Sequence, residues 1–278
     1  MSACEGALPR VVACMPAWNS EKFIKDTLDS LAAQTYANLE LLISDDASSD
    51  RTAAICQEFA RTHARVRYLR QPRRLGWIGN VNSLLQIARG DYFFFAFHDD
   101  PLKPTYVERL VDALERHPDA VLAFADVEVH GTPRAFTALE GVQDRAERAR
   151  RVLRWEGDWW VPNRGLFRAG AARELRGMRR HIAGEFAADW PWLLRLTLLG
   201  EFVRVPEVLV RKVWLKEGLT RVWRHSAWQK FGVSLACASV IRKADFPLSE
   251  ELELYSHLVL PPAKRIWWRL HGQVRDLS

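Results

Sequence analysis

Short apolar segments alternate with amphipathic segments over the first half of the chain. Most of these segments are brief and nearly continuous, which suits strands that are buried on both faces, whereas in one of them Val66 and Tyr68 alternate with Arg65 and Arg67. These segments occupy the ranges 10–15, 39–44, 65–69, 92–97 and 120–127. Between them, apolar side chains recur at intervals of three and four residues, which indicates helices with one buried face. The order of elements predicts an α/β fold with a doubly wound, mostly parallel sheet and flanking helices.

The second half of the chain is more mixed. An apolar helix is expected over 189–199, with Asp189 as its N-cap. Two short strands are expected over 201–213, divided by Pro206, which cannot donate to a sheet. From Thr220 onward the spacing of apolar residues is helical. A helix N-cap is also expected early in the chain, at Asn19 or Ser20.

Two of the predicted strands end in a pair of acids. Asp45 and Asp46 follow one strand, and Asp99 and Asp100 follow another. The carboxyl ends of parallel strands meet at one edge of a sheet, where α/β proteins bind ligands. Carboxylates there can accept hydrogen bonds from a ribose or a base, or hold Mg²⁺ or Mn²⁺. The alternative is that such acids only cap the next helix or begin a turn, as in Asp100-Pro101.

Composition limits the classes of protein that fit. The 278 residues are 48% hydrophobic and 27% charged, which is ordinary for a globular chain. The four cysteines show neither CxxC pairing nor metal-ligand spacing, so reduced thiols are expected. The N-terminal residues lack a signal-peptide pattern, and the longest apolar candidate, 231–241, is too short to cross a bilayer. A cytoplasmic protein, soluble or peripheral on the inner membrane face, is expected.

The net charge of +6 is unevenly distributed. Residues 211–278 hold 12 Lys/Arg and 6 Asp/Glu, which accounts for the whole excess (12 − 6 = +6). Tryptophans lie among these basic residues, at Trp223 and Trp228 and in the run 264–269. Such a segment can lie on an anionic membrane, pack on the catalytic domain with its basic side in water, or contact another subunit.

Several segments, taken in order, resemble the family 2 glycosyltransferases of the GT-A fold. The resemblance covers roughly residues 10–215 and rests on the order and spacing of its parts more than on any single motif. Its parts are Pro16-Ala-Trp-Asn19, Gln34-Thr-Tyr36, Leu42–Thr52, Gly76–Asn82, Ala88–Asp91, the acids at 99–100, Arg164–Arg168 and Ala188-Asp189-Trp190. It divides the chain into a catalytic domain at 1–215 and a basic, Trp-rich helical extension at 216–278.

The resemblance implies a donor sugar bound as a nucleotide diphosphate sugar; the sequence does not name the base, and UDP is the nucleoside diphosphate expected to bind. Asp46 would accept a hydrogen bond from the base and Asp99 would hold the ribose. The other residues that it implies at the donor are Pro16, Ala17, Asn19 and Glu21 around base and ribose, and Arg74 or Asn80 as further nucleotide contacts.

The resemblance also implies the chemistry of transfer. Asp100 would ligate a divalent metal, Mn²⁺ or Mg²⁺, that bridges the diphosphate and stabilises the leaving group. Asp189 would be the general base that takes the proton of the acceptor hydroxyl. The reaction would be a single inverting displacement onto a glycan, lipid-linked or small-molecule acceptor, as in polysaccharide biosynthesis.

The chain departs from the family pattern at the metal. Many members have Asp-x-Asp, whereas Phe97-His98-Asp99 here lacks the first acid. Many also have a metal-binding His after the last strand, where this chain reads Arg-Lys-Val-Trp-Leu-Lys over 211–216. With one firm acidic ligand, a weakly bound metal is expected.

Other functions fit the sequence less well. A nucleotidyltransferase would share the sheet and the acids but needs a Gly-rich, basic first loop, which Pro16-Ala-Trp-Asn19 is not. A degenerate transferase would bind the sugar nucleotide without turnover. A nucleic-acid-binding protein would use the basic extension, and its binding would depend steeply on salt; no nucleic-acid partner is expected.

Overall fold

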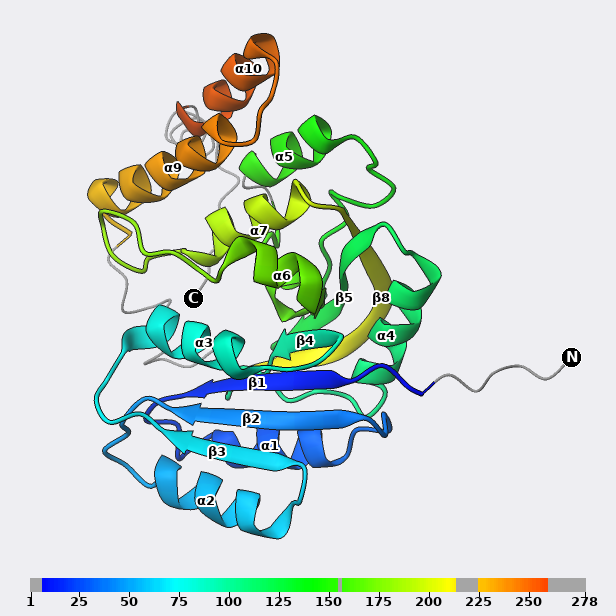
Figure 1. The fold of residues 1–278 in the computed structure, drawn as a ribbon, viewed down its shortest axis with the longest axis vertical. Coiled ribbons are helices and arrows are strands. Elements are labelled where there is room, and N and C mark those ends of the chain that lie inside the picture. The colour runs from blue at the N-terminus through cyan, green and yellow to red at the C-terminus, as the bar shows by residue number, and fades with distance from the viewer. Residues whose placement is uncertain (1–6, 155–156, 214–224, 260–278) are drawn as a thin grey trace, which may run out of the picture.

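The fold is built on one mixed sheet of eight strands in the order β3-β2-β1-β4-β7-β5-β6, with β8 paired to β5. The computed structural model describes residues 7–154, 157–213 and 225–259 (Figure 1). The predictions for the basic run 264–269 and for Trp223 concern residues outside these ranges.

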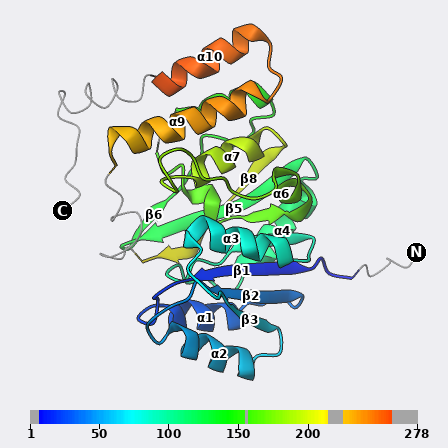
Figure 2. The ribbon, with the colours of Figure 1, turned by 60° about the vertical axis from the view of Figure 1, so that its left-hand side comes forward.

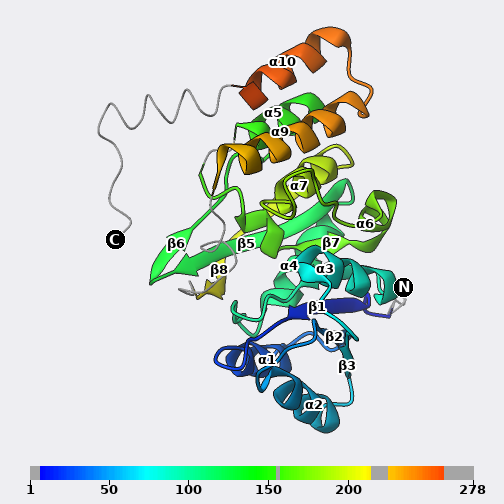
Figure 3. The ribbon, with the colours of Figure 1, turned by 90° about the vertical axis from the view of Figure 1, so that its left-hand side faces the viewer.

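The first four strands of the chain are parallel. Helices α1 and α2 lie on one side of them and α3 on the other (Figures 1 and 3). The elements are β1 (Val11–Ala17), α1 (Ile24–Ala32), β2 (Leu39–Asp45), α2 (Thr52–Thr62), β3 (Val66–Arg70), α3 (Gly76–Ile87) and β4 (Tyr92–Phe95). All four residues of β4 are buried, as their continuous apolar sequence predicts.

The rest of the sheet is mixed. The elements are α4 (Tyr106–Arg116), β5 (Ala120–Val129), β6 (Thr132–Arg134), β7 (Leu166–Arg168) and β8 (Glu201–Lys212). Strand β7 runs antiparallel between β4 and β5, and β8 runs parallel to β5. Phe167 of β7 stacks on Phe93 of β4, with ring centroids 5.0 Å apart, and joins the two halves of the core. The predicted α/β architecture is confirmed.

A group of helices covers the β5 end of the sheet. Helices α9 and α10 lie at the end of the molecule farthest from β2 and β3, next to α5 and α7 (Figures 1 and 2). The elements are α5 (Arg145–Leu153), the short 3-10 helix η1 (Val161–Arg164), α6 (Ala169–Leu175), α7 (Asp189–Thr197), α9 (Ala227–Arg242) and α10 (Leu248–Val259). No helix among the described residues is long and apolar enough to cross a bilayer.

One strand prediction was wrong. The range 201–213 forms the single strand β8 instead of two strands divided by Pro206. The register with β5 steps from Ala125–Val205 to Asp126–Val208, so Pro206 and Glu207 are passed over in the pairing. A bulge absorbs the missing proline N–H without ending the strand.

Both N-cap predictions were also wrong. Helix α1 begins at Ile24 after Phe23, while the carbonyl of Ser20 accepts the N–H groups of Phe23 and Ile24 in a preceding turn. Helix α7 has Ala188 as its N-cap, so Asp189 is its first residue. Asp189 therefore lies in the first turn of the helix and not at the N-cap position.

Candidate active site

The two acid pairs lie at one edge of the sheet. Strands β2, β1 and β4 are adjacent and parallel, so Asp46 after β2 and Asp99-Asp100 after β4 flank the end of β1 at Ala17. This convergence is the one that the sequence predicts for parallel strands. The roles of the individual residues depend on what each side chain already contacts.

Asp46 holds the start of helix α3. Its Oδ1 accepts the N–H of Leu75 at 2.6 Å and its Oδ2 accepts the N–H of Gly76 at 3.0 Å. The carboxyl is buried; burial raises its pKa, and the two amides and Arg74 oppose the rise. Gly76 has a φ of +78°, and a Cβ there would lie 2.8 Å from the Glu185 carboxylate, so only glycine fits.

The loop after β1 is tied to the loop after β2. The N–H of Asn19 donates to Ser48 Oγ at 3.0 Å, and Asn19 Oδ1 accepts the N–H of Ser49 at 2.9 Å. Glu21 Oε2 accepts the N–H of Arg51 at 2.9 Å. These bonds shape the wall beside Pro16 and Ala17, of which Ala17 is buried and Pro16 partly buried.

The two further nucleotide candidates differ in their surroundings. Arg74 is exposed, and its guanidinium lies over the Trp18 ring, 3.5 Å from the centroid. Asn80 is 2% exposed, and its amide is bonded to Ser44 (Oδ1 to Oγ 2.5 Å, Nδ2 to the carbonyl 2.8 Å). The contacts of Asn80 support a structural role that joins α3 to β2 instead of a nucleotide contact.

Asp100 is paired with two cations. Arg164 Nε donates to its Oδ2 at 2.9 Å, and Lys212 Nζ donates to its Oδ1 at 3.3 Å. The side chains are 2% (Asp100), 13% (Arg164) and 9% (Lys212) exposed, so this is an interior cluster. Burial alone raises the pKa of Asp100, but Lys212 and Arg164 outweigh it and lower that pKa below its ordinary value.

The cluster is rigid on the arginine side. The Arg164 guanidinium lies 4.8 Å from the Trp160 ring centroid and 5.0 Å from that of Phe97, and Nη1 donates to the Trp160 carbonyl at 3.3 Å. Lys212 Nζ also lies 4.0 Å from Asp99 Oδ2. The Trp160 and Phe97 rings, the Trp160 carbonyl and the Asp100 carboxylate thus hold the Arg164 guanidinium at the edge of the sheet.

These residues do not fit a divalent metal at Asp100. A metal needs oxygen ligands about 2.0–2.6 Å away, and both Asp100 oxygens already face positive groups. Across residues 7–154, 157–213 and 225–259, no group of three or more His, Cys, Asp or Glu side chains is placed to hold a metal ion. The expectation that Asp100 ligates a metal is therefore not supported by its surroundings.

Asp189 lies beside this cluster. Asn163 Nδ2 donates to its Oδ2 at 3.3 Å. The surrounding protein desolvates the carboxyl and raises its pKa, while Arg164 acts in the opposite direction. Two residues before Asp189, Ala187 has a φ of +46° that alanine rarely adopts. A partly exposed carboxylate with a raised pKa on a strained segment is suited to accept a proton.

The segment before Asp189 is bonded to the start of α3. Arg180 Nη2 donates to the Leu75 carbonyl at 2.6 Å, and Arg180 pairs with Glu185 at 2.8 Å. Trp77 Nε1 donates to the Glu185 carbonyl at 3.4 Å. Asp46 and the segment that leads to Asp189 are thereby connected through Leu75, Arg180 and Glu185.

Three residues of the site were not singled out from the sequence: Asn163, Arg164 and Lys212. Arg164 and Lys212 stand 64 and 112 positions from Asp100. The family-like segments included Arg164 and the range 211–216 included Lys212, but no local spacing links either to Asp100.

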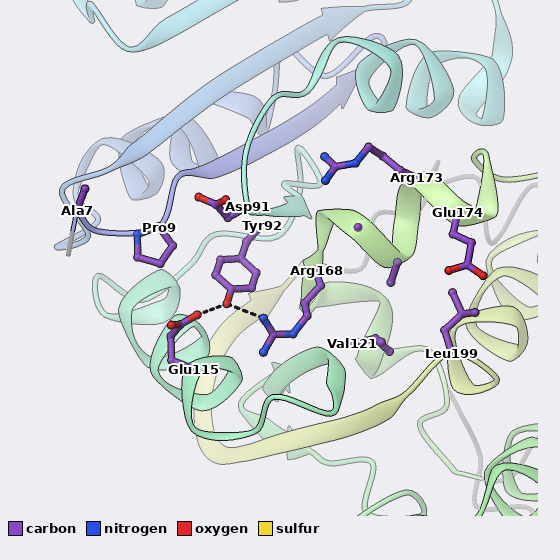
Figure 4. A pocket seen from close by; sticks show the side chains of 12 residues that line it. Ala7, Pro9, Asp91, Tyr92, Glu115, Val121, Arg168, Arg173, Glu174 and Leu199 are labelled. Atoms are coloured by element: carbon purple, nitrogen blue, oxygen red, sulfur yellow. Dashed lines mark hydrogen bonds between the residues drawn. The ribbon is translucent and has the colours of Figure 1, made fainter.

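A cavity of about 720 Å³ lies elsewhere, at the opposite edge of the sheet (Figure 4). Its lining includes Asp91, which precedes β4, and Tyr92, which accepts a hydrogen bond from Arg168 at 3.0 Å and contacts Glu115. Because it opens at the amino end of β4, it is remote from the carboxyl-edge acids.

Comparison with known proteins relates the chain to glycosyltransferases. Residues 12–170 match the glycosyl transferase family 2 sequence family. The uncharacterized protein MT1568 of Mycobacterium tuberculosis is 31% identical over 234 residues, which are 78% of this chain and 71% of that protein. The glycosyltransferase GlyA of Streptococcus pneumoniae is 30% identical over 133 residues, 48% of this chain and 18% of that protein. The matched segments span a third or less of several relatives.

Solved structures share the fold. TarS 1–349 of S. aureus in complex with UDP-GlcNAc superposes with a TM-score of 0.75 at 15% identity, covering 95% of this chain and 76% of that one. The mannosyltransferase PcManGT of Pyrobaculum calidifontis, in complex with GDP-Man and Mn²⁺, gives a TM-score of 0.58 at 17% identity, covering 97% and 76%.

Proposed function

The chain belongs to glycosyl transferase family 2, and we propose that it moves a sugar from a nucleoside diphosphate donor to a hydroxyl acceptor in a single inverting displacement. The observation that carries this proposal is the position of Asp189, held by Asn163 beside Arg164 at the carboxyl edge of the sheet. We assign the catalytic domain to residues 1–215 and an extension to 216–278.

Asp189 is the general base of this mechanism. The acceptor oxygen attacks the anomeric carbon as Asp189 takes its proton, and the nucleoside diphosphate leaves on the opposite side. The raised pKa of Asp189 makes its carboxylate a stronger base than an ordinary aspartate. Asn163 donates to Oδ2, and hydrogen bonds from the backbone N–H groups of Asp189 and Trp190 also favour the charged carboxylate.

The donor lies along the edge between Asp46 and Asp99. The loop after β1, which contains Asn19 and Glu21, is hydrogen-bonded to the loop after β2 and lines this edge. The Arg74 guanidinium lies over the Trp18 ring nearby. We favour uridine as the base because TarS, which shares the fold, was solved with UDP-GlcNAc. The Mn²⁺ of the PcManGT complex belongs to that protein; with Asp100 paired to Arg164 and Lys212, no step here is assigned to a metal.

An exposed apolar face on α9 supports the proposal that the extension makes a peripheral contact with a membrane. Trp228, Phe231 and Leu235 are exposed on one face of α9, with the first two rings 5.9 Å apart. Beside Leu235, a cavity of about 550 Å³ between α7 and α9 is lined by described residues that include five Arg or Lys side chains and no Asp or Glu. Aromatic and basic groups together fit an anionic lipid surface, where a lipid-linked acceptor would be presented.

The test of the proposed function is donor turnover. The purified chain is incubated with UDP-, GDP-, CDP- and ADP-sugars and a panel of glycan and lipid-linked acceptors, and release of the nucleoside diphosphate is followed. Transfer with inversion at the anomeric carbon, detected by NMR of the product, is expected. Nucleotide binding without transfer or hydrolysis would instead identify a degenerate transferase.

A further inference from the structure

We propose, building on the function above, that Lys212 and Arg164, held in place by Asp100, supply the positive charge for the donor's diphosphate in place of a divalent cation. The basis is the direction of the contacts at Asp100. The acid expected to ligate a metal has one oxygen on a guanidinium and the other on an ammonium.

The three side chains come from separate elements that meet at the donor edge. Asp100 follows β4, Arg164 ends η1, and Lys212 is the last residue of β8. The N–H of Val213 donates to the Asp99 carbonyl at 3.2 Å, which fastens the end of β8 to the acid pair. The fold itself thus brings Lys212 to this position.

The two cations are suited to different parts of the task. Arg164 is fixed by Trp160 and Phe97, so its charge is preorganised beside Asp189. Lys212 carries its charge on a flexible four-carbon stem, which allows the ammonium to reorient from Asp100 toward a phosphate. Asp100 is a positioning residue in this arrangement, and a metal at its oxygens would face both cations at close range.

The charge balance of transfer requires such groups. The acceptor oxygen forms a bond to the anomeric carbon, the bond from that carbon to the diphosphate oxygen breaks with its electron pair, and Asp189 takes the acceptor's proton. The nucleoside diphosphate leaves with one more negative charge than it had in the donor. Lys212 and Arg164 would stabilise that charge as it develops.

The experiment is calorimetric titration of the full chain with UDP, GDP, CDP and ADP, in EDTA and again in MnCl₂. We expect at least one nucleoside diphosphate to bind in EDTA, with a Kd within about threefold of its value in Mn²⁺. Lys212→Met should weaken binding in EDTA at least about tenfold, because a charge-assisted contact is lost. Lys212→Arg should restore most of it, and Lys25→Met, on exposed α1, should change nothing.

Binding that disappears in EDTA and returns with Mn²⁺ would overturn the inference and leave the proposed function standing. So would a folded Lys212→Met protein that binds like wild type. If no nucleoside diphosphate binds in either buffer, the donor site is absent and both proposals fall. The wild-type comparison decides the question even if Lys212→Met does not fold, which far-UV circular dichroism would show.

Discussion

Asn163 donates its side-chain amide to Oδ2 of Asp189 at 3.3 Å across 26 positions of sequence. Asn163 is 2% exposed, so the bond is shielded from water and fixes the orientation of the carboxylate. Arg164, the residue after Asn163, connects Asp189 electrostatically to the Asp100 cluster. The candidate base is thus oriented by an amide and flanked by a fixed positive charge.

The first prediction concerns Asp189→Asn. Loss of the general base should lower the transfer rate about 10²–10⁴-fold, while the Kd for UDP stays close to wild type because Asp189 is proposed to contact the acceptor and not the nucleotide. Steady-state rates and UDP titration measure the two effects. Asp112→Asn, an exposed acid on α4, is the matched control and should be silent. Near-full activity of Asp189→Asn would remove the catalytic assignment.

The second prediction is a pH profile. Burial raises the pKa of Asp189 above the ordinary 3.8, whereas the cations lower that of Asp100. As pH falls, Asp189 is protonated first, so kcat should decline at a pH above the ordinary aspartate value while Asp100 keeps its ion pairs. Rate measured against pH, with circular dichroism to confirm that the chain stays folded, tests this. A decline only below 3.8 would contradict it.

The third prediction follows from the same shift by linkage. A folded pKa raised above the unfolded value means that Asp189 favours folding below the unfolded pKa and that this contribution is lost as pH rises through the folded pKa. At neutral pH the charged carboxyl therefore opposes folding, and Asp189→Asn should raise the melting temperature. At pH values below 3.8 the increase in melting temperature caused by Asp189→Asn should vanish. A lower melting temperature at neutral pH would show that the carboxylate is structural.

The fourth prediction distinguishes Asp46 from Asn80. Asp46→Ala leaves the N–H groups of Leu75 and Gly76 without their acceptor. It should lower the free energy of unfolding by about 1–3 kcal/mol for each amide that stays unsatisfied and also weaken UDP binding.

Asn80→Ala is the comparison. It should destabilise by a similar amount, because its bonds to Ser44 are lost, but leave the Kd for UDP unchanged. Urea unfolding and UDP titration of both variants provide the measurements. If Asn80→Ala unfolded like wild type and lost UDP affinity, Asn80 would be reassigned as a nucleotide contact.

The fifth prediction concerns the exposed face of α9. Trp228→Ser/Phe231→Ser should reduce cosedimentation with phosphatidylglycerol vesicles, and wild-type binding should fall as salt rises. Leu248→Ser/Leu252→Ser, on the equally exposed α10, is the matched control. Equal recovery of wild type on phosphatidylglycerol and phosphatidylcholine vesicles would favour a packed extension without membrane contact.

The sequence by itself determined the α/β architecture and the edge of the sheet at which the two acid pairs meet. Continuous apolar segments such as Tyr92–Phe95 predict buried strands because their periodicity is local. Parallel strands then bring Asp46 and Asp99-Asp100 to one edge without any knowledge of packing. The first residues of the helices were harder to predict, since Asn19 and Asp189 have side chains suited to N-caps but the N-cap positions are occupied by Phe23 and Ala188.

Only the tertiary structure decided what each acid contacts. Arg164 and Lys212 reach Asp100 from 64 and 112 positions away, and Asn163 reaches Asp189 from a different element. Asp46 holds α3 instead of the helix that follows it, and Asn80 turns inward to Ser44. Such contacts depend on how strands and helices pack, and a buried carboxylate takes whichever donors packing places within reach, because leaving it unpaired costs several kcal/mol.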